Sequence, residues 1–456
     1  MTDDSRTAAL RAQVRALMAR AKDDLTELVS FRSVHDPRQF PAQECRQAAQ
    51  WVLDAFVEVG LTDAGLHETS DGSLAVVARY PAPAGAPTVL LYSHYDVQPP
   101  LDEDAWRTPV WELTERDGRW YGRGAADCKG NVLAHLTALR ALRETLGDKG
   151  YPVGITLVCE GSEEQGTGGL EAFVPEHADL LRADALVIGD CGNAAVGVPT
   201  FTQTLRGTVN VILAVETLAG PMHSGMFGGP APDALAALIH LLATLRDEHG
   251  NTTITGLPAD QVWDGVQYPP ERFRADAGVL DGVDLLGDGT VADMAWARPT
   301  ATVLGIDAPN VVGAVAAVQG SVRALINLRI PPGIDPETAL KALTAHLESK
   351  TPWHARVTVT PDAAGAPFRS GTGGPARRAM EAAFAAAYGR ESTTQGQGGS
   401  IPLCNVFAET YPEAEIMLIG VEEPSCLIHA PNESVDPSEI EHIALTEALF
   451  LASYGS

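Results

Sequence analysis

The sequence has no long run of apolar residues. Its apolar stretches, such as Thr88 to Tyr92, are long enough for a strand only, whereas a membrane-spanning helix needs about 20 apolar residues. The N-terminal segment from Met1 to Leu10 is polar and lacks the apolar core of a secretory signal. We therefore expect a cytoplasmic protein that has no membrane partner.

Cysteine is scarce and scattered. The six cysteines form no Cys-x-x-Cys pair, which argues against a disulfide framework and against a cysteine-rich zinc module. They are Cys45, Cys128, Cys159, Cys191, Cys404 and Cys426. This usage fits a reducing cytoplasm.

Basic residues are also few. Lys and Arg number 32 against 59 Asp and Glu, so the formal net charge is −27. Such a surface repels phosphate backbones and anionic lipids, so we expect no nucleic-acid partner. The simplest interpretation is a solvated acidic surface that aids solubility, and the charge says little about the substrate.

Length and pattern predict an α/β protein with two domains. The chain has 456 residues, more than the roughly 250–300 that one core usually serves. Helical spacing over 7–30 and 131–146 alternates with short, uninterrupted apolar runs, which are typical of strands buried on both faces. These runs are Thr88–Tyr92, Ile155–Cys159, Ala185–Ile188 and Ile416–Ile419.

The middle of the chain follows a different pattern. Polar and apolar residues alternate there, which predicts strands with one wet face, and a helix is expected over 233–246. The alternating segments are 208–215, 321–330 and 355–360. We therefore predict an α+β domain over 201–367, inserted between the two parts of the first domain, 1–200 and 368–456. Residues 251–297 have weak periodicity and receive no assignment.

Two helices are expected after the insertion, over 375–388 and from Asp436 onward. Asp436 is a typical helix cap, Pro437 suits the first helical position, and Glu439 can complete a capping box.

Several acidic and histidine side chains lie at strand ends, where α/β sheets carry their ligands. They are His94, Asp96, Asp127, Glu163, Glu164, Asp190 and His429. Imidazoles and carboxylates together suit divalent ions such as Zn²⁺ or Mn²⁺. One carboxylate can bridge two ions about 3.5–4 Å apart, which polarise a carbonyl and generate hydroxide near neutral pH. A further carboxylate must then carry the proton of the water to the leaving amine.

Each residue also has a simpler interpretation. His94 could be a structural histidine held by hydrogen bonds, and Asp127 could cap a turn or a helix. Glu163-Glu164 could be solvated surface charge. Their joint placement after buried strands is much harder to explain in this way.

Six motifs resemble those of one known family. The chain looks like the dinuclear metallopeptidases, which include carnosinases, carboxypeptidase G, succinyl-diaminopimelate desuccinylase and the aminoacylases. The motifs stand in family order and span almost the whole chain. They are Leu91-Tyr92-Ser93-His94-Tyr95-Asp96-Val97-Gln98-Pro99, Tyr121-Gly122-Arg123-Gly124-Ala125-Ala126-Asp127-Cys128-Lys129-Gly130, Glu160-Gly161-Ser162-Glu163-Glu164-Gln165-Gly166, Met222-His223-Ser224-Gly225, Gly398-Gly399-Ser400-Ile401-Pro402 and His429-Ala430-Pro431-Asn432-Glu433.

The resemblance implies an α/β fold in which a mixed, mainly parallel sheet forms the catalytic domain. The insertion would be an α+β, ferredoxin-like lid and dimerisation domain. Two divalent ions per chain, Zn²⁺ or Mn²⁺ with Co²⁺ as an alternative, are implied as cofactors.

The resemblance also assigns roles to the strand-end residues. One metal would be held by His94, Asp127 and Asp190, and the other by Asp127, Glu164 and His429. Glu163 would be the general base, and Asp96 would orient His94. Cys128 stands where the family often has Asp, Asn or Met. This departure leaves the ligands intact, although a thiol there would make the site sensitive to oxidation.

The resemblance also implies roles for residues that do not lie at the strand ends. His223 would stabilise the developing oxyanion in the active site of the other subunit of a homodimer. Arg329 would grip the substrate carboxylate, for which a bidentate guanidinium is suited. Ser400 and Asn310 are weaker candidates for substrate contact. The simpler interpretation of His223 is a structural histidine in a turn, and that of Arg329 is an exposed arginine on a strand.

Three functions compete. The first is hydrolysis of the amide bond in dipeptides or short peptides by a water bridged between two metals, as in the carnosinase-like branch. The second is removal of an acyl group from an N-acyl amino acid on the same scaffold. The third, an inactive binding homologue, is disfavoured because every expected ligand and the base are present.

Overall fold

The computed structural model describes residues 3–455, and their contacts divide the chain into two compact units. The first unit holds the chain up to Gln203, then Ser370–Gln395 and the chain from Val406 onward. The second holds Thr204–Arg369 and Gly396–Asn405. Sequence patterning places the last of these segments in the first domain, 368–456.

Local contacts explain why Gly396–Asn405 belongs to the second unit. The backbone N–H of Arg206 donates to the carbonyl of Gln397 at 3.2 Å, and the Asn405 amide donates to the carbonyl of Ala366, also at 3.2 Å. These contacts join residues far apart in the sequence, so the hydrophobic periodicity of the sequence does not predict them.

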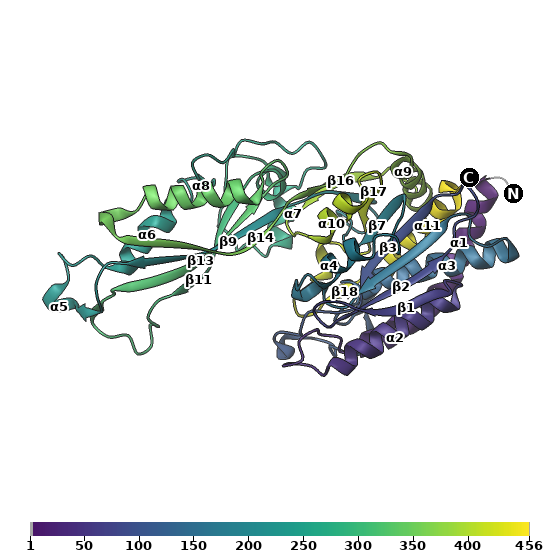
Figure 1. Ribbon diagram of the computed structural model, residues 1–456, viewed down its shortest axis with the longest axis horizontal. Helices are drawn as coiled ribbons and strands as arrows, with labels where there is room; N and C mark the ends of the chain where they lie inside the picture. Colours follow the sequence, from purple (N-terminus) through teal and green to yellow (C-terminus); the bar gives the residue numbers. More distant parts are fainter. Residues whose placement is uncertain (1–2, 456) are drawn as a thin grey trace. The chain divides into compact units, whose positions relative to one another are not determined.

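Most strands of a mixed sheet lie in the first unit (Figure 1). Its four central strands, β6, β3, β7 and β17, run parallel, and antiparallel pairings continue the sheet on both sides. In spatial order the strands are β1 (Asp63–Glu68), β2 (Leu74–Tyr80), β6 (Gly154–Glu160), β3 (Thr88–His94), β7 (Ala185–Gly189), β17 (Glu415–Ile419), β8 (Thr200–Leu205) and β15 (Phe368–Arg369), with β16 (Thr393–Gln397) also paired to β8. The predicted α/β fold with a mixed sheet is confirmed.

Helices cover this sheet and explain its uninterrupted apolar strands. Every residue of β6 and β7 is buried, as expected for strands that are covered on both faces. Helices α1, α3, α9 and α11 pack against one another, and α2 packs on β1 and β2. The helices are α1 (Asp3–Ser30), α2 (Ala42–Glu58), α3 (Lys129–Leu146), α4 (Gly169–Glu176), α9 (Pro375–Tyr388), α10 (Leu403–Thr410) and α11 (Pro437–Tyr454).

The start of α11 confirms one prediction and corrects another. The Asp436 carboxylate accepts the N–H of Ser438 at 2.9 Å, so it caps the helix. Glu439 forms no capping box. Its carboxylate instead accepts the N–H of Gly197 at 2.6 Å and the hydroxyl of Tyr388 at 2.9 Å, because it is fully buried and these donors need an acceptor.

The second unit has the chain order β-α-β-β-α-β. Its antiparallel sheet has the strand order β11-β13-β9-β14, and α6 and α8 pack on one face of it (Figure 1). These elements are β9 (Gly207–Glu216), α6 (Ala234–Ala243), β11 (Thr300–Asp307), β13 (Ser321–Ile330), α8 (Pro336–Ser349) and β14 (Arg356–Gly365). Both chain order and strand order are ferredoxin-like, as expected. Along β9, buried residues alternate with half-buried ones.

Residues 251–297 contain little regular structure. They include the short helix α7 (Pro270–Asp276) and a π-helical turn over Asp293–Ala297. A small apolar core forms around Trp263 and Trp296, whose ring centres lie 5.3 Å apart. The Asp293 carboxylate accepts the N–H of Trp263 at 2.6 Å. Individual side-chain contacts of this kind hold the segment together. They produce no repeating pattern in the sequence, so sequence analysis could not assign the segment.

Within residues 3–455, no helix is both long enough and apolar enough to cross a membrane.

Candidate metal centre

The predicted donors come together in the first unit, near the carboxyl ends of its parallel strands. His94 is the last residue of β3, and Asp190 follows β7 directly. Glu163 and Glu164 lie in a short 3₁₀ turn after β6. Asp127 and His429 come from connecting segments, the first before α3 and the second after β17.

Asp127 lies between two imidazoles. Its Oδ1 is 3.1 Å from Nε2 of His94, and its Oδ2 is 3.0 Å from Nε2 of His429. Although burial opposes the effect, hydrogen bonds from His429 and His94 hold the pKa of the Asp127 carboxyl below its usual range. Two oxygens that face two different histidines are what a bridging carboxylate requires.

Each imidazole also contacts a second carboxylate. Nε2 of His94 lies 3.2 Å from Oδ1 of Asp190, and Nε2 of His429 lies 3.0 Å from Oε2 of Glu164. Hydrogen bonds to Asp127 and Glu164 raise the pKa of His429 to about 11. The donors therefore form two groups that meet at Asp127.

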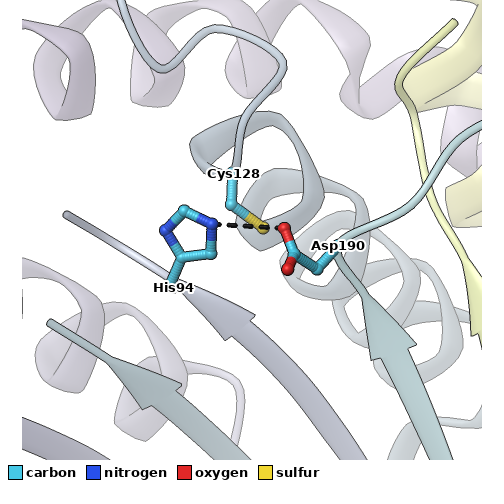
Figure 2. A group of neighbouring side chains, drawn as sticks. All are labelled: His94, Cys128 and Asp190. Carbon is cyan, nitrogen blue, oxygen red and sulfur yellow. Dashed lines mark hydrogen bonds and ion pairs between the residues drawn. The ribbon is translucent and has the colours of Figure 1, made fainter. Parts of the chain in front are cut away.

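Cys128 joins the first group; sequence analysis placed its thiol at the site but did not count it among the donors. Figure 2 shows its thiol beside the ion pair of His94 and Asp190, and donor atoms of the three lie within 4.8 Å of one another. The thiol donates to the carbonyl of Gly189 at 2.8 Å, and burial raises its pKa well above the usual range. The thiol therefore lies beside this donor group and holds a hydrogen bond to the backbone.

Asp96 and Gln98 hold the surrounding side chains. Asp96 is fully buried, and its Oδ1 lies 3.3 Å from Nδ1 of His94. Its two oxygens also accept the N–H groups of Glu163 and Glu164 at 3.2 and 3.1 Å. The Gln98 amide donates to Oε2 of Glu164 at 2.9 Å. Gln98 lies inside a recognised motif, yet its role was missed because amide contacts leave no pattern in the sequence.

The site contains more carboxyl groups than imidazoles, and the pKa values of three of the carboxyl groups are raised. Burial, followed by the Asp190 carboxylate, raises the pKa of Glu163 well above its usual range. Burial, followed by Asp127, raises the pKa of Glu164 to about 7. Burial also raises the pKa of Asp190. Divalent cations would supply the missing positive charge, so the residues present fit a metal centre.

The remaining predicted site residues lie in the second unit. His223 belongs to the short strand β10 (Met222–His223), is exposed, and accepts the N–H of Gly225 through Nδ1 at 3.1 Å. Asn310 is exposed in the segment after β11, and Ser400 is half-buried. Arg329 is half-buried in β13.

A second arginine lies near Arg329. Arg206 precedes β9 and donates to the hydroxyl of Thr300 at 2.8 Å, and Thr300 is the cross-strand partner of Arg329. Burial, followed by the charge of Arg329, lowers the pKa of Arg206 to about 10. The buried Nε of Arg206 has no hydrogen-bond partner. Within residues 3–455, no acidic side chain forms an ion pair with Arg206 or Arg329. The two positive charges would therefore attract a bound anion. Sequence reasoning missed Arg206 because its partner lies far along the chain.

Carboxylates in excess over imidazoles, at the carboxyl edge of a mixed α/β sheet, are typical of metal-dependent hydrolases. Comparison with known sequences identifies the family within this class of hydrolases. The profile of Peptidase family M20/M25/M40 matches residues 90–452. The chain belongs to this family, as the motif resemblance implied, and the prediction of a peptidase is confirmed.

Two relatives with dipeptidase names match this chain over two thirds or more of their own length. The chain is 44% identical over 436 residues to a cysteinylglycine-S-conjugate dipeptidase of Corynebacterium striatum, with 95% of each chain covered. It is 28% identical to the Cys-Gly metallodipeptidase of Schizosaccharomyces pombe, covering 66% of this chain and 67% of that one. These names agree with the predicted carnosinase-like dipeptidase branch.

Solved structures agree on the fold. Human carnosine dipeptidase 1 superposes with a TM-score of 0.81 at 25% identity, and 98% of each chain is covered. The dipeptidase Dug1p of Saccharomyces cerevisiae also gives a TM-score of 0.81 at 22% identity, covering 100% of this chain and 99% of that one.

Proposed function

We propose that this peptidase hydrolyses cysteinylglycine and its S-substituted conjugates with two divalent ions that share Asp127. The observation that carries the proposal is the Asp127 carboxylate, whose two oxygens face His94 and His429. The substrate class rests on the relative that is 44% identical over 95% of both chains.

The donor groups suggest which residues hold each ion. His94, Asp127 and Asp190 would hold one, and Asp127, Glu164 and His429 the other. When bound, such ions polarise a peptide carbonyl and make water a better nucleophile near neutral pH. Nitrogen and carboxylate donors fit Zn²⁺, Mn²⁺ or Co²⁺, and we propose these as the working metals.

Glu163 would move the proton. Its carboxylate would accept a proton from the attacking water and then donate that proton to the leaving amine. The backbone N–H of Glu163 is tied to Asp96, which also contacts His94. The base and one imidazole are thus held by the same buried carboxylate.

Arg206 and Arg329 would bind the free carboxylate of the dipeptide. The two guanidiniums form no ion pair with an acidic side chain in the described part of the chain, which favours an anion there, and a bidentate contact would fix its orientation. Ser400 and Asn310 remain proposed contacts to the substrate.

We also propose a homodimer formed through the second unit. β11 is an edge strand, and its apolar side chains Val303, Leu304 and Ile306 are 39%, 56% and 46% exposed. An exposed apolar edge invites pairing with another strand. In such a dimer, His223 would supply an oxyanion donor to the active site of the other subunit.

The cytoplasm is the proposed location. All six cysteines lie in the described part of the chain, where none is joined to another by a disulfide, and this fits a reducing compartment.

A substrate panel tests the proposed reaction. Amino-acid release would be measured with Cys-Gly, an S-alkylated Cys-Gly, β-Ala-His and an N-acetyl amino acid, each with Zn²⁺, Mn²⁺ or Co²⁺. We expect the first two to be cleaved with the highest kcat/KM. Preference for the N-acetyl amino acid would instead establish a deacylase, and cleavage of none would contradict the proposal.

A further inference from the structure

Glu433 is a buried acid with no part in the proposed chemistry. It lies four residues after His429, is 0% exposed, and directly precedes β18 (Ser434–Val435). A fully buried carboxylate is costly unless several donors satisfy it. The identity of those donors shows what this residue does.

Three of its donors are backbone N–H groups of the segment that carries Asp127. Oε2 of Glu433 accepts the N–H of Gly124 at 3.0 Å. Oε1 accepts the N–H groups of Ala126 and Asp127 itself at 3.0 and 3.1 Å. The guanidinium of Arg123 adds an ion pair to Oε2 at 2.8 Å.

The hydrogen bonds to Glu433 fix a segment that belongs to no helix or strand. Asp127 lies between β5 (Arg119–Tyr121) and the start of α3, where neither a helix nor a sheet fixes the backbone. The carbonyl of Glu433 also accepts the N–H of Gly122 at 3.1 Å, and β18 pairs with β5. Glu433 therefore joins the segment that carries His429 to the segment that carries Asp127.

We propose that Glu433 is a positioning residue that sets the metal affinity of the centre by holding the backbone of Asp127 in place. This proposal rests on the proposed metal function. Glu433 donates no atom to a metal; it acts through the peptide N–H of Asp127 and its neighbours. Residues that orient metal ligands typically change affinity or activity 10- to 100-fold when they are replaced.

The test compares Glu433→Gln with a matched control, Glu439→Gln. A glutamine offers one acceptor oxygen, so it cannot satisfy donors at both positions. Glu439 is also 0% exposed, lies in the same unit and accepts a backbone N–H, that of Gly197. Replacing it disturbs a buried carboxylate without touching the Asp127 segment.

Metal-depleted proteins would be titrated with Mn²⁺ in competition with a chromophoric chelator, and Tm would be measured without metal. We expect Glu433→Gln to bind Mn²⁺ about 10- to 100-fold more weakly than wild type, with activity returning at saturating Mn²⁺. Glu439→Gln should stay within about twofold of wild type in affinity, whatever its Tm.

Equal Mn²⁺ affinity of wild type and Glu433→Gln would overturn the proposal, as would an equal loss in both variants. If Glu433→Gln does not fold, Glu433→Asp replaces it, because the shorter acid keeps the charge but cannot reach all three N–H groups. Wild-type affinity in that variant would refute the idea equally. A wild-type protein that binds no Mn²⁺, Zn²⁺ or Co²⁺ would remove the proposed function as well.

Discussion

Replacing Glu163 with Gln separates proton transfer from metal binding. Within the described residues, the carboxylate of Glu163 makes no hydrogen bond, while burial and Asp190 raise its pKa. The substitution is close to isosteric and removes the carboxylate that would carry the proton. General-base catalysis contributes typically 10²- to 10⁴-fold, so kcat should fall by that factor, or about 2.7–5.4 kcal/mol in activation free energy.

Glu164→Ala is the matched comparison. Glu164 contacts His429 at 3.0 Å and Gln98 at 2.9 Å, so its loss opens one donor group. The assay measures kcat on Cys-Gly and metal content by elemental analysis for both variants. We expect Glu163→Gln to keep its metal and Glu164→Ala to lose occupancy. The reverse result would show that the base and the ligand have been exchanged.

Three further perturbations test other parts of the account. Mixing inactive His223→Ala chains with inactive Glu163→Gln chains should restore activity to about a quarter of wild type by random pairing into dimers; continued inactivity despite subunit exchange would contradict a shared site. Arg206→Met should raise KM for a dipeptide about 10- to 100-fold, the loss of one charged hydrogen bond, but change KM little for its C-terminal amide; equal effects on both would argue against carboxylate binding. Asp436→Ala should lower the free energy of unfolding by about 1 kcal/mol, measured with denaturant, because the cap of α11 is lost; an unchanged value would mean that the cap contributes nothing.

Elements with strong periodicity could be predicted from the sequence. The helix expected over 375–388 is α9 with the same ends, and the strand expected over 321–330 is β13. The helix expected over 233–246 ends at Ala243, since its last residues turn into a loop. Residues 251–297 could not be predicted, because a small core around Trp263 and Trp296 leaves no repeating pattern.

The candidate site could be located because His94, Glu163, Glu164 and Asp190 lie at the ends of apolar runs, and these runs are neighbouring parallel strands. Contacts between distant segments could not be read in the same way. Gln98 on Glu164, Arg206 beside Arg329 and the hydrogen bonds of Glu433 all depend on which side chains meet in three dimensions. The catalytic and binding roles of individual residues remain predictions.

The central claim is that two divalent ions per chain share Asp127. The most direct measurement is the metal content of active protein alongside its activity, before and after a strong chelator, for wild type and Asp127→Asn. We predict two ions per wild-type chain, loss of activity on chelation with recovery when metal returns, and greatly reduced occupancy of both sites in the variant. A fully active protein that contains no divalent metal, or an Asp127→Asn variant that keeps both ions, would contradict the account.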